Sequence, residues 1–290
     1  MDAAARFPDS VAILGPGLLG GSLALALKSD FGAAVDVRLW ARRDAALQEA
    51  TGAADLLTND LEKATRDAEM VVLATPVGIM ASLCSQLAPY LRPGTLVTDV
   101  GSVKGSLVRP IREALSRSDV PYLGSHPMAG SEQTGFKAAR ADLFQRAVCI
   151  LTPDESNAPA DIERLETFWL RLGCKTLRMS AEEHDRKIAR ISHLPHAVAS
   201  AVVRAALAAD PTAAECTGNG FRDATRIAGG DPGMWAGILL ENRDQVLAAL
   251  HDVSSQITEL VEILRRLDEE ALRRYLDAAR SLRKHVPAAR

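Results

Sequence analysis

Histidines stand at two places in the sequence where they could transfer a proton. His126 follows a short predicted strand and precedes a proline, and its ordinary pKa near neutrality suits a general acid or base. His193 and His196 lie in a predicted helix with Ser192, which is four residues before His196 and therefore on the same face. Polar groups in an apolar helix are costly to bury unless they are bonded or used. Both places are candidate catalytic or substrate-binding sites, and a purely structural histidine is the alternative at each.

A metal site made of His193, His196 and His184 is a further alternative. The sequence places no cluster of carboxylates or cysteines beside these histidines to complete a ligand set. We therefore expect no bound metal.

Ser102 and Lys104 follow another predicted strand, residues 95–100. In an alternating strand and helix fold, ligands bind at the carboxyl ends of strands, so these side chains are expected where a cofactor and a substrate meet. The Ser102 hydroxyl also suits the N-cap of a helix predicted over residues 103–117. The two roles are compatible.

Arg222 and Arg226 are spaced to share one face of a helix. The guanidinium fork binds carboxylates through two hydrogen bonds, so the pair indicates an anionic substrate. A surface ion pair with Asp223 or Glu241 is the alternative. Trp235 fits a pocket wall as well as it fits the core.

A glycine-rich turn organises the N-terminal half of the chain. Gly15, Gly17 and Gly20 have the spacing G-x-G-x-x-G, after an apolar run at 11–14 and before an apolar helical stretch at 18–27. This order of strand, turn and helix is the context that the dinucleotide-binding fingerprint requires. We expect the pyrophosphate of a dinucleotide at the start of that helix.

Other residues are expected beside the same cofactor. Leu18 and Leu19 open the helix, while Thr75, Pro76 and Gly101 stand at the ends of neighbouring strands. An ordinary proline turn is the alternative at Thr75-Pro76.

The patterns predict an α/β fold with a Rossmann-type, doubly wound parallel sheet over residues 1–180, followed by an all-α domain over residues 181–290. The further predicted strands are 34–40, 70–74, 121–124, 147–152 and 175–179, and the further helices are 42–52, 81–91 and 159–172.

From residue 180 onward strand signals stop. A long helical stretch is predicted over 181–209, interrupted at Pro195. A second long helix is predicted over 241–267, where apolar residues alternate in steps of four and three. We favour a partner subunit's helix against this seam, and packing within one subunit is the alternative.

Composition limits the class of protein. The chain has 290 residues, 47% hydrophobic and 24% charged, with a net charge of -3, which gives no electrostatic reason to expect nucleic acid or an anionic membrane as partner. No apolar run is long enough to span a membrane, and we see no secretion signal at the N-terminus. Four scattered cysteines form no pairing motif, so we expect buried thiols and a reducing cytoplasm.

Taken together and in order, the motifs resemble those of the prephenate/arogenate dehydrogenase family. They lie at 15–22, 74–76, 99–104, 125–132, 192–196, 220–223, 225–228, 231–235 and 241–242. The resemblance implies oxidative decarboxylation of a cyclohexadienol in tyrosine biosynthesis, with hydride transfer to a nicotinamide. Prephenate would give 4-hydroxyphenylpyruvate and CO2, and arogenate would give tyrosine.

The resemblance also implies roles for single residues. His126 would accept the proton of the ring hydroxyl, supported by Ser102, and Arg226 would bind a substrate carboxylate. The other implied substrate-binding residues are Ser131, Glu132, Ser192, His193, His196 and Trp235. In the family His193 would pair with Glu132, and Trp235 would reach the pocket from the other subunit of a dimer formed by the helical domain.

The end of the second strand departs from the pattern of many NAD-using relatives. Ala41, Arg42 and Arg43 stand where those relatives have an acidic residue for the ribose hydroxyls. An arginine there can bind a 2′-phosphate, so we expect NADP, with NAD as the alternative. We also expect an enzyme with one activity, in which any inhibition by tyrosine acts at the active site.

Two other interpretations stay open. A related imine or β-hydroxyacid dehydrogenase would use a lysine of the helical domain, for which Lys187 is the candidate. A dinucleotide-sensing dimer without catalysis would leave Ser102, His126, His196 and Arg226 unexplained.

Overall fold

The computed structural model describes residues 6–116 and 118–286, and five parallel strands form its central sheet. Their order is β3–β2–β1–β4–β5, and their bounds are Ser10–Leu14 (β1), Asp36–Trp40 (β2), Leu56–Thr58 (β3), Met70–Leu73 (β4) and Leu96–Asp99 (β5). All residues of β1, β4 and β5 are buried, as expected for strands covered on both faces. Leu14 pairs with both Trp40 and Leu73, and Leu73 pairs with Asp99, so these strands end at one level.

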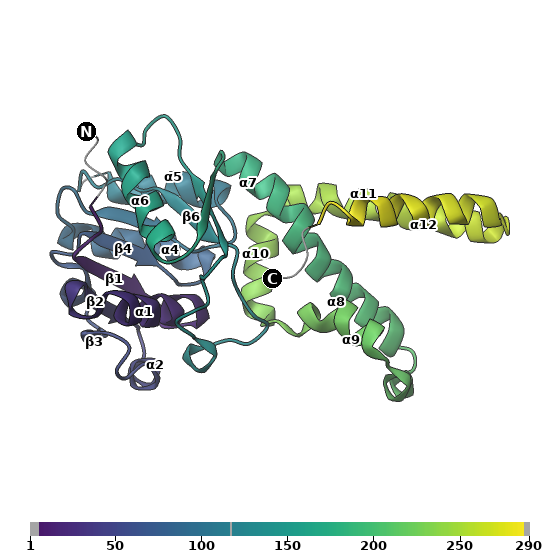
Figure 1. Cartoon of the computed structure of the whole chain (residues 1–290), viewed down its shortest axis with the longest axis horizontal. Coiled ribbons are helices and arrows are strands. Elements are labelled where there is room, and N and C mark those ends of the chain that lie inside the picture. Colours follow the sequence, from purple (N-terminus) through teal and green to yellow (C-terminus); the bar gives the residue numbers. More distant parts are fainter. Residues whose placement is uncertain (1–5, 117, 287–290) are drawn as a thin grey trace. The chain divides into compact units, whose positions relative to one another are not determined.

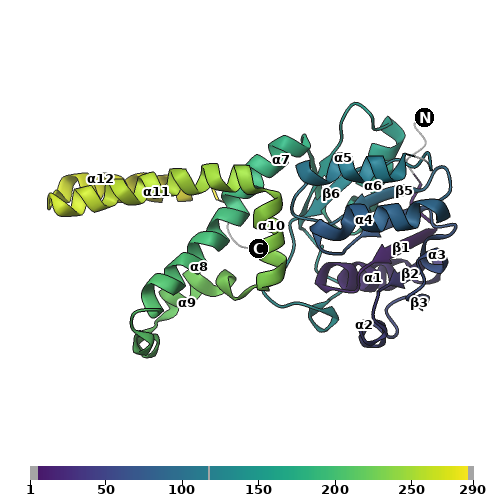
Figure 2. The same ribbon diagram turned by 180° about the vertical axis from the view of Figure 1, so that it is seen from behind.

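Helices cover both faces of this sheet. Helices α1 (Leu18–Phe31) and α6 (Pro159–Arg171) share one core cluster with β1, while α3 (Leu61–Thr65), α4 (Val77–Leu87) and α5 (Gly105–Leu115) share the other. Figures 1 and 2 show the two helical layers from opposite sides. The predicted doubly wound architecture is therefore confirmed.

Several short elements are absent from the sequence-based prediction. Strand β3 and helix α3 are three and five residues long, which is too short to show a periodic pattern. Helix α2 (Asp44–Glu49) is shorter than predicted. Helix α4 begins at Val77, directly after Pro76, which is four residues earlier than predicted.

A second sheet continues from β5. It contains β6 (Gly124–Pro127), β7 (Val148–Thr152) and β8 (Lys175–Arg178), and β6 runs antiparallel to β7. An isolated parallel bridge joins Val97 of β5 to Tyr122, just before β6. The predicted strand at 121–124 is thus displaced by three residues, and His126 lies inside β6.

The predicted helical stretch at 181–209 is divided into α7 (Ala181–Ile188), a π-helical turn (Ala189–His193) and α8 (Leu194–Leu207). Pro195 is the second residue of α8, which continues from the π-helical turn without a non-helical residue between them. Ile191, four residues before Pro195, lies in that turn, where a proline removes the backbone donor and crowds the carbonyl. The predicted interruption at Pro195 is therefore confirmed and takes the form of a π-helical turn.

Helices α9 (Asn219–Thr225) and α10 (Pro232–Glu241) follow, and α10 packs against α4. Residues 1–243 form one compact unit, and residues 244–290 form a second. The predicted helix at 241–267 is in fact the end of α10 and a separate helix, α11 (Arg243–Arg265).

Helix α11 and the unpredicted helix α12 (Glu269–Arg283) form a hairpin (Figures 1 and 2), in which the Tyr275 hydroxyl donates a hydrogen bond to the Gln256 carbonyl. The seam residues Ile257, Leu264 and Leu267 are exposed. None of the helices within the described ranges is long and apolar enough to cross a membrane.

Candidate functional site

The turn between β1 and α1 is built by close backbone contacts. Gly15 has a φ of +117°, and a Cβ there would lie 2.6 Å from the Ala74 carbonyl oxygen. A Cβ on Gly20 would lie 1.9 Å from the Gly15 carbonyl oxygen. Both positions require glycine, and they hold the turn against the end of β4.

Gly17 differs from its two neighbours in the motif. A Cβ there would meet nothing within 4 Å, so packing does not explain why this residue is glycine. Gly17 is the N-cap of α1 and bonds no side chain to the helix, which leaves the amides of Leu18 and Leu19 for an outside acceptor. This open, positively polarised space fits the pyrophosphate of a dinucleotide.

The other expected cofactor residues lie around this turn. The Gly15 amide donates to the Trp40 carbonyl at 2.9 Å, which brings the end of β2 beside the glycine turn. Arg42 and Arg43 follow there and are exposed, whereas Ala41 is buried. The Thr75 hydroxyl is buried without a hydrogen-bond partner in the described residues.

A buried charge network lies at the end of β5. Lys104 and Asp99 form an ion pair with both side chains fully buried, and the Tyr122 hydroxyl donates to Asp99 Oδ2 at 2.7 Å. The Gly101 amide donates to Asp99 Oδ1. The Asp99 carboxylate therefore has partners for both oxygens, as a buried charge requires.

His126 lies beside this network. The Ser125 hydroxyl, one residue earlier, donates to the Asp99 carbonyl at 2.6 Å and fixes β6 against the end of β5. Nδ1 of His126 lies 2.8 Å from Nε2 of His184. Burial, followed by the nearby His184 and Lys104, holds the pKa of His126 well below its ordinary value. The imidazole is therefore neutral near pH 7 and can act as a base.

The prediction that Ser102 caps α5 is wrong. The helix begins at Gly105, and its N-cap, Lys104, makes no side-chain capping bond. The amides of Lys104 and Gly105 donate instead to the Asp185 carboxylate of α7, at 2.8 and 2.7 Å. An acceptor distant in the sequence has taken the capping role.

His193 is fully buried, and its Nδ1 lies 3.2 Å from the Asn242 side-chain nitrogen. Burial lowers its pKa to about 4. The implied pairing of His193 with Glu132 is not formed in this structure, where Glu132 bonds Arg226 and His193 contacts Asn242. Nε2 of His193 and Nδ1 of His196 are buried polar atoms without a hydrogen-bond partner in the described residues.

Trp235 is a pocket wall of its own chain. Its ring stacks on His196 with 3.6 Å between ring centroids and 9° between planes. The contribution of Trp235 to the pocket of a second subunit stays a prediction. Ser192 lies in the π-helical turn, one residue before His193.

Arg226 is paired with Glu132 at 2.5 Å, and the arginine side chain is 58% exposed. Neither of the expected alternatives, Asp223 and Glu241, is its partner in this ion pair. Ser131, next to Glu132, accepts a hydrogen bond from the Gln133 amide. The guanidinium is accessible and can exchange its partner for a substrate carboxylate.

Comparison with known proteins decides the family. The family model described as prephenate dehydrogenase, nucleotide-binding domain, matches residues 23–178, and the model described as prephenate dehydrogenase, dimerization domain, matches residues 180–278. The chain belongs to the prephenate dehydrogenase family. It is therefore an NAD(P)-dependent dehydrogenase with a nucleotide-binding domain, as predicted.

Three relatives illustrate the likeness to this family. The prephenate dehydrogenase of Bacillus subtilis is 32% identical over 97% of this chain and 77% of its own. The crystal structure of prephenate dehydrogenase from A. aeolicus in complex with hydroxyphenyl propionate and NAD+ has a TM-score of 0.88 and 30% identity, covering 96% of this chain and 98% of its own. Synechocystis arogenate dehydrogenase has a TM-score of 0.78 and 28% identity, covering 96% and 100%.

Sequence reasoning did not single out Asp185 or the link between His184 and His126. The two segments are 58 residues apart, and neither has a spacing that signals the other. The pair His184-Asp185 is the one signal in the sequence that could have pointed to this link, because a carboxylate beside a histidine often orients its ring.

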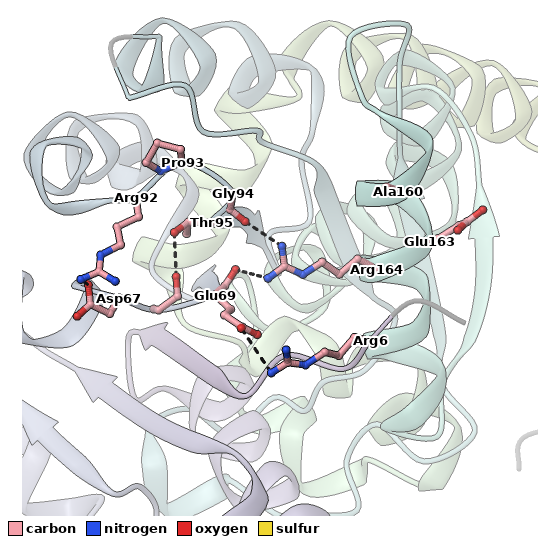
Figure 3. A pocket seen from close by; sticks show the side chains of 11 residues that line it. Arg6, Asp67, Glu69, Arg92, Pro93, Gly94, Thr95, Ala160, Glu163 and Arg164 are labelled. Atoms are coloured by element: carbon pink, nitrogen blue, oxygen red, sulfur yellow. Dashed lines mark hydrogen bonds and ion pairs between the residues drawn. The ribbon is translucent and has the colours of Figure 1, made fainter. Parts of the chain in front are cut away.

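A groove of about 630 Å³ lies at the opposite, amino-terminal end of the strands (Figure 3). Its three arginines are already bonded: Arg92 to Asp67, Arg164 to the carbonyls of Gly94 and Glu69, and Arg6 to acidic neighbours. We assign no ligand to this groove.

The glycine turn generates a test of the dinucleotide site. Gly17→Ala should leave the melting temperature within about 2 °C, because a Cβ there meets nothing, but should weaken dinucleotide binding at least tenfold. Gly20→Ala is the matched variant and should lower the melting temperature, because its Cβ meets the Gly15 carbonyl. Calorimetry of unfolding and of dinucleotide binding measures both, and unchanged affinity in Gly17→Ala would contradict the assignment.

Proposed function

We propose that this protein oxidises prephenate, arogenate or both with a nicotinamide dinucleotide as hydride acceptor, with loss of CO2, in tyrosine biosynthesis. The observation that carries the proposal is the neutral, buried imidazole of His126, held at the end of the sheet where the glycine turn also lies. Membership of the prephenate dehydrogenase family supports it.

The reaction needs a base, and His126 is suited to be that base. Nδ1 of its ring is engaged with His184, so Nε2 is the atom left for the ring hydroxyl of the substrate. As the hydroxyl loses its proton to Nε2, the oxygen becomes a carbonyl and the hydrogen on the same carbon leaves with its electron pair. The bound dinucleotide supplies the nicotinamide that takes up this hydride.

Loss of the ring carboxylate as CO2 leaves its bonding electrons in the ring, which becomes aromatic. The carbonyl oxygen becomes a phenolate, which takes back the proton that Nε2 of His126 had accepted and so becomes the phenol. This step needs no further base from the protein, and aromatisation supplies much of the driving force.

Other side chains would bind and orient the substrate. Arg226 would exchange Glu132 for a substrate carboxylate. His193 and His196 would bind substrate oxygens, and Trp235 holds the His196 ring by stacking. We propose that Ser102 assists at the ring hydroxyl, and that Ser131 and Ser192 lie close to the bound substrate.

We infer that NADP is preferred over NAD. Arg42 and Arg43 follow Ala41 at the end of β2, and the Asp44 carboxylate accepts a hydrogen bond from the Asn59 side chain. This position therefore carries two exposed cationic side chains, where many NAD-using relatives have a carboxylate for the ribose hydroxyls. A 2′-phosphate would gain charge-assisted hydrogen bonds there.

Further parts of the prediction concern assembly and regulation. We propose a cytoplasmic homodimer formed through a helical domain beginning near residue 181, supported by the family model for dimerization over 180–278. We also propose that any inhibition by tyrosine acts at the substrate site. The two compact units of the chain divide at residue 243 and do not test the boundary near residue 180.

The alternative of an imine or β-hydroxyacid dehydrogenase has little support from its candidate lysine. Lys187 is about half exposed and forms an ion pair with Glu183 at 2.6 Å, which is an ordinary surface arrangement. A sensing protein without turnover stays an outcome of the assay below.

Turnover and its dependence on His126 are tested together. Reduction of the nicotinamide should be seen with prephenate or arogenate, and His126→Asn should lower kcat by roughly a hundredfold or more while dinucleotide affinity stays unchanged. Steady-state absorbance measurements with both substrates and both cofactors check this. No turnover in any combination would refute the proposed function.

Arg226→Ala should raise KM by about one to two powers of ten, because a charge-assisted hydrogen bond contributes roughly 1.5–3 kcal/mol. Arg222→Ala is the matched control on the same helical segment. If the control raises KM and Arg226→Ala does not, the carboxylate role belongs to Arg222.

Cofactor choice is tested at the end of β2. The ratio of kcat/KM for NADP to that for NAD should exceed one in the native protein and fall at least tenfold in the double variant Arg42→Ala, Arg43→Ala. The same ratio in Arg38→Ala, within β2, serves as the control. A native preference for NAD would contradict this inference.

A further inference from the structure

A continuous chain of hydrogen bonds leads from His126 into the interior of the protein. Nδ1 of His126 lies 2.8 Å from Nε2 of His184, and Nδ1 of His184 lies 2.8 Å from Oδ1 of Asp185. The two oxygens of Asp185 accept the amides of Lys104 and Gly105. The side chains of His126, His184 and Asp185 are all buried.

The chemistry of the groups fixes the direction of these bonds. The Asp185 carboxylate can only accept, so Nδ1 of His184 carries a proton and donates it. A neutral imidazole carries one proton, so Nε2 of His184 accepts, and Nδ1–H of His126 must be the donor. His184 is neutral because burial lowers its pKa. His126 is thereby held in the tautomer whose Nε2 has a free lone pair.

Asp185, at the inner end of this series of hydrogen bonds, is held in place by other elements. Asp185 occupies the amino terminus of α5, a helix of eleven residues, where backbone amides and the helix dipole stabilise a carboxylate. The Asn242 side chain donates to the Asp185 carbonyl at 2.9 Å and also lies 3.2 Å from His193. Both the carboxylate and its own backbone are therefore fixed by other elements.

We propose that His184 and Asp185 are positioning residues for the base of this enzyme: they set the tautomer of His126 and stabilise the imidazolium formed when His126 takes the substrate proton. This inference rests on the proposed function. The substrate proton stays on Nε2 of His126 during hydride transfer and is not passed on to His184 or Asp185. The carboxylate acts through the intervening ring of His184.

Other ionisable groups face His126, and each bears on its pH dependence. Lys104 and Asp99 form the ion pair at the end of β5, and His193 approaches from the π-helical turn. Cys149 of β7 and Tyr122 have pKa values raised well above their ordinary range by burial, so both stay neutral. Burial lowers the pKa of His193 to about 4, so its ring also stays neutral near pH 7.

The decisive variant is His184→Phe, which keeps a ring but removes the acceptor. It should lower kcat about a hundredfold, the scale of general-base catalysis. The acidic limb of the kcat profile should move to lower pH by about one unit, because the imidazolium of His126 loses its support. Substrate KM and dinucleotide affinity should stay within about threefold of native, whereas a purely structural defect would change them.

His184→Gln is the rescue variant, since its amide oxygen can accept from Nδ1–H of His126 and its NH2 can donate to Asp185. It should recover at least tenfold of the loss in kcat. His285→Phe, at an exposed histidine, is the matched control and should leave the rate and the pH profile unchanged.

Nitrogen-15 NMR of the histidine rings reads the tautomer without turnover. The signals of His126 are those that disappear in His126→Asn, and they should show a protonated Nδ1 in the native protein. In His184→Phe, which removes the acceptor, the fraction of His126 with a protonated Nδ1 should fall. A protonated Nε2 in the native enzyme would overturn the proposal, and so would a His184→Phe variant with native kcat and pH profile.

The two proposals fail in different ways. Absence of turnover with prephenate and arogenate would refute the proposed function, while the NMR tautomer would still decide whether His184 and Asp185 orient His126. Turnover together with a native His184→Phe variant would refute the positioning role alone.

Discussion

The carboxylate of Asp185 accepts hydrogen bonds from three groups that come from two distant segments of the chain. Two are the first amides of α5, and the third is the ring of its neighbour His184. A buried carboxylate is stable only when its oxygens are bonded, so α7 cannot shift without breaking the cap of α5. This interaction joins the helical segment after residue 180 to the end of the sheet, and the site is assembled at that junction.

Burial of charge governs the chemistry of the site. The Lys104 and Asp99 ion pair is fully enclosed, and its partners satisfy both carboxylate oxygens. The lysine charge and the low polarity around His126 both disfavour a second cation there, which keeps the base neutral. In the same environment the hydrogen bond from His126 to Nε2 of His184 stabilises the His126 ring more than it would in water, because hydrogen bonds are strongest where water is excluded.

The sheet and its covering helices could be predicted from the sequence because long apolar runs and glycine turns report local geometry. The start of α5 could not, since Asp185 supplies its cap from 80 residues away. The interruption at Pro195 could be predicted, because a proline removes a backbone donor and crowds the carbonyl four residues earlier, but its form as a π-helical turn could not. Helix α12 was missed although the sequence signals it: Leu272, Tyr275, Leu276, Ala279 and Leu282 have helical spacing, and Asp268 caps the first turn.

The sequence by itself determined the family and the dinucleotide fold, because each rests on residue types at fixed short spacings. Only the tertiary structure decided which groups the histidines contact. His126 lies within hydrogen-bond distance of His184, His193 lies close to Asn242, and the His196 ring stacks on Trp235. It also replaced the expected partner of Glu132 by Arg226. Hydrogen bonds and ring contacts between distant segments depend on angstrom-scale packing, which spacing along the chain does not encode.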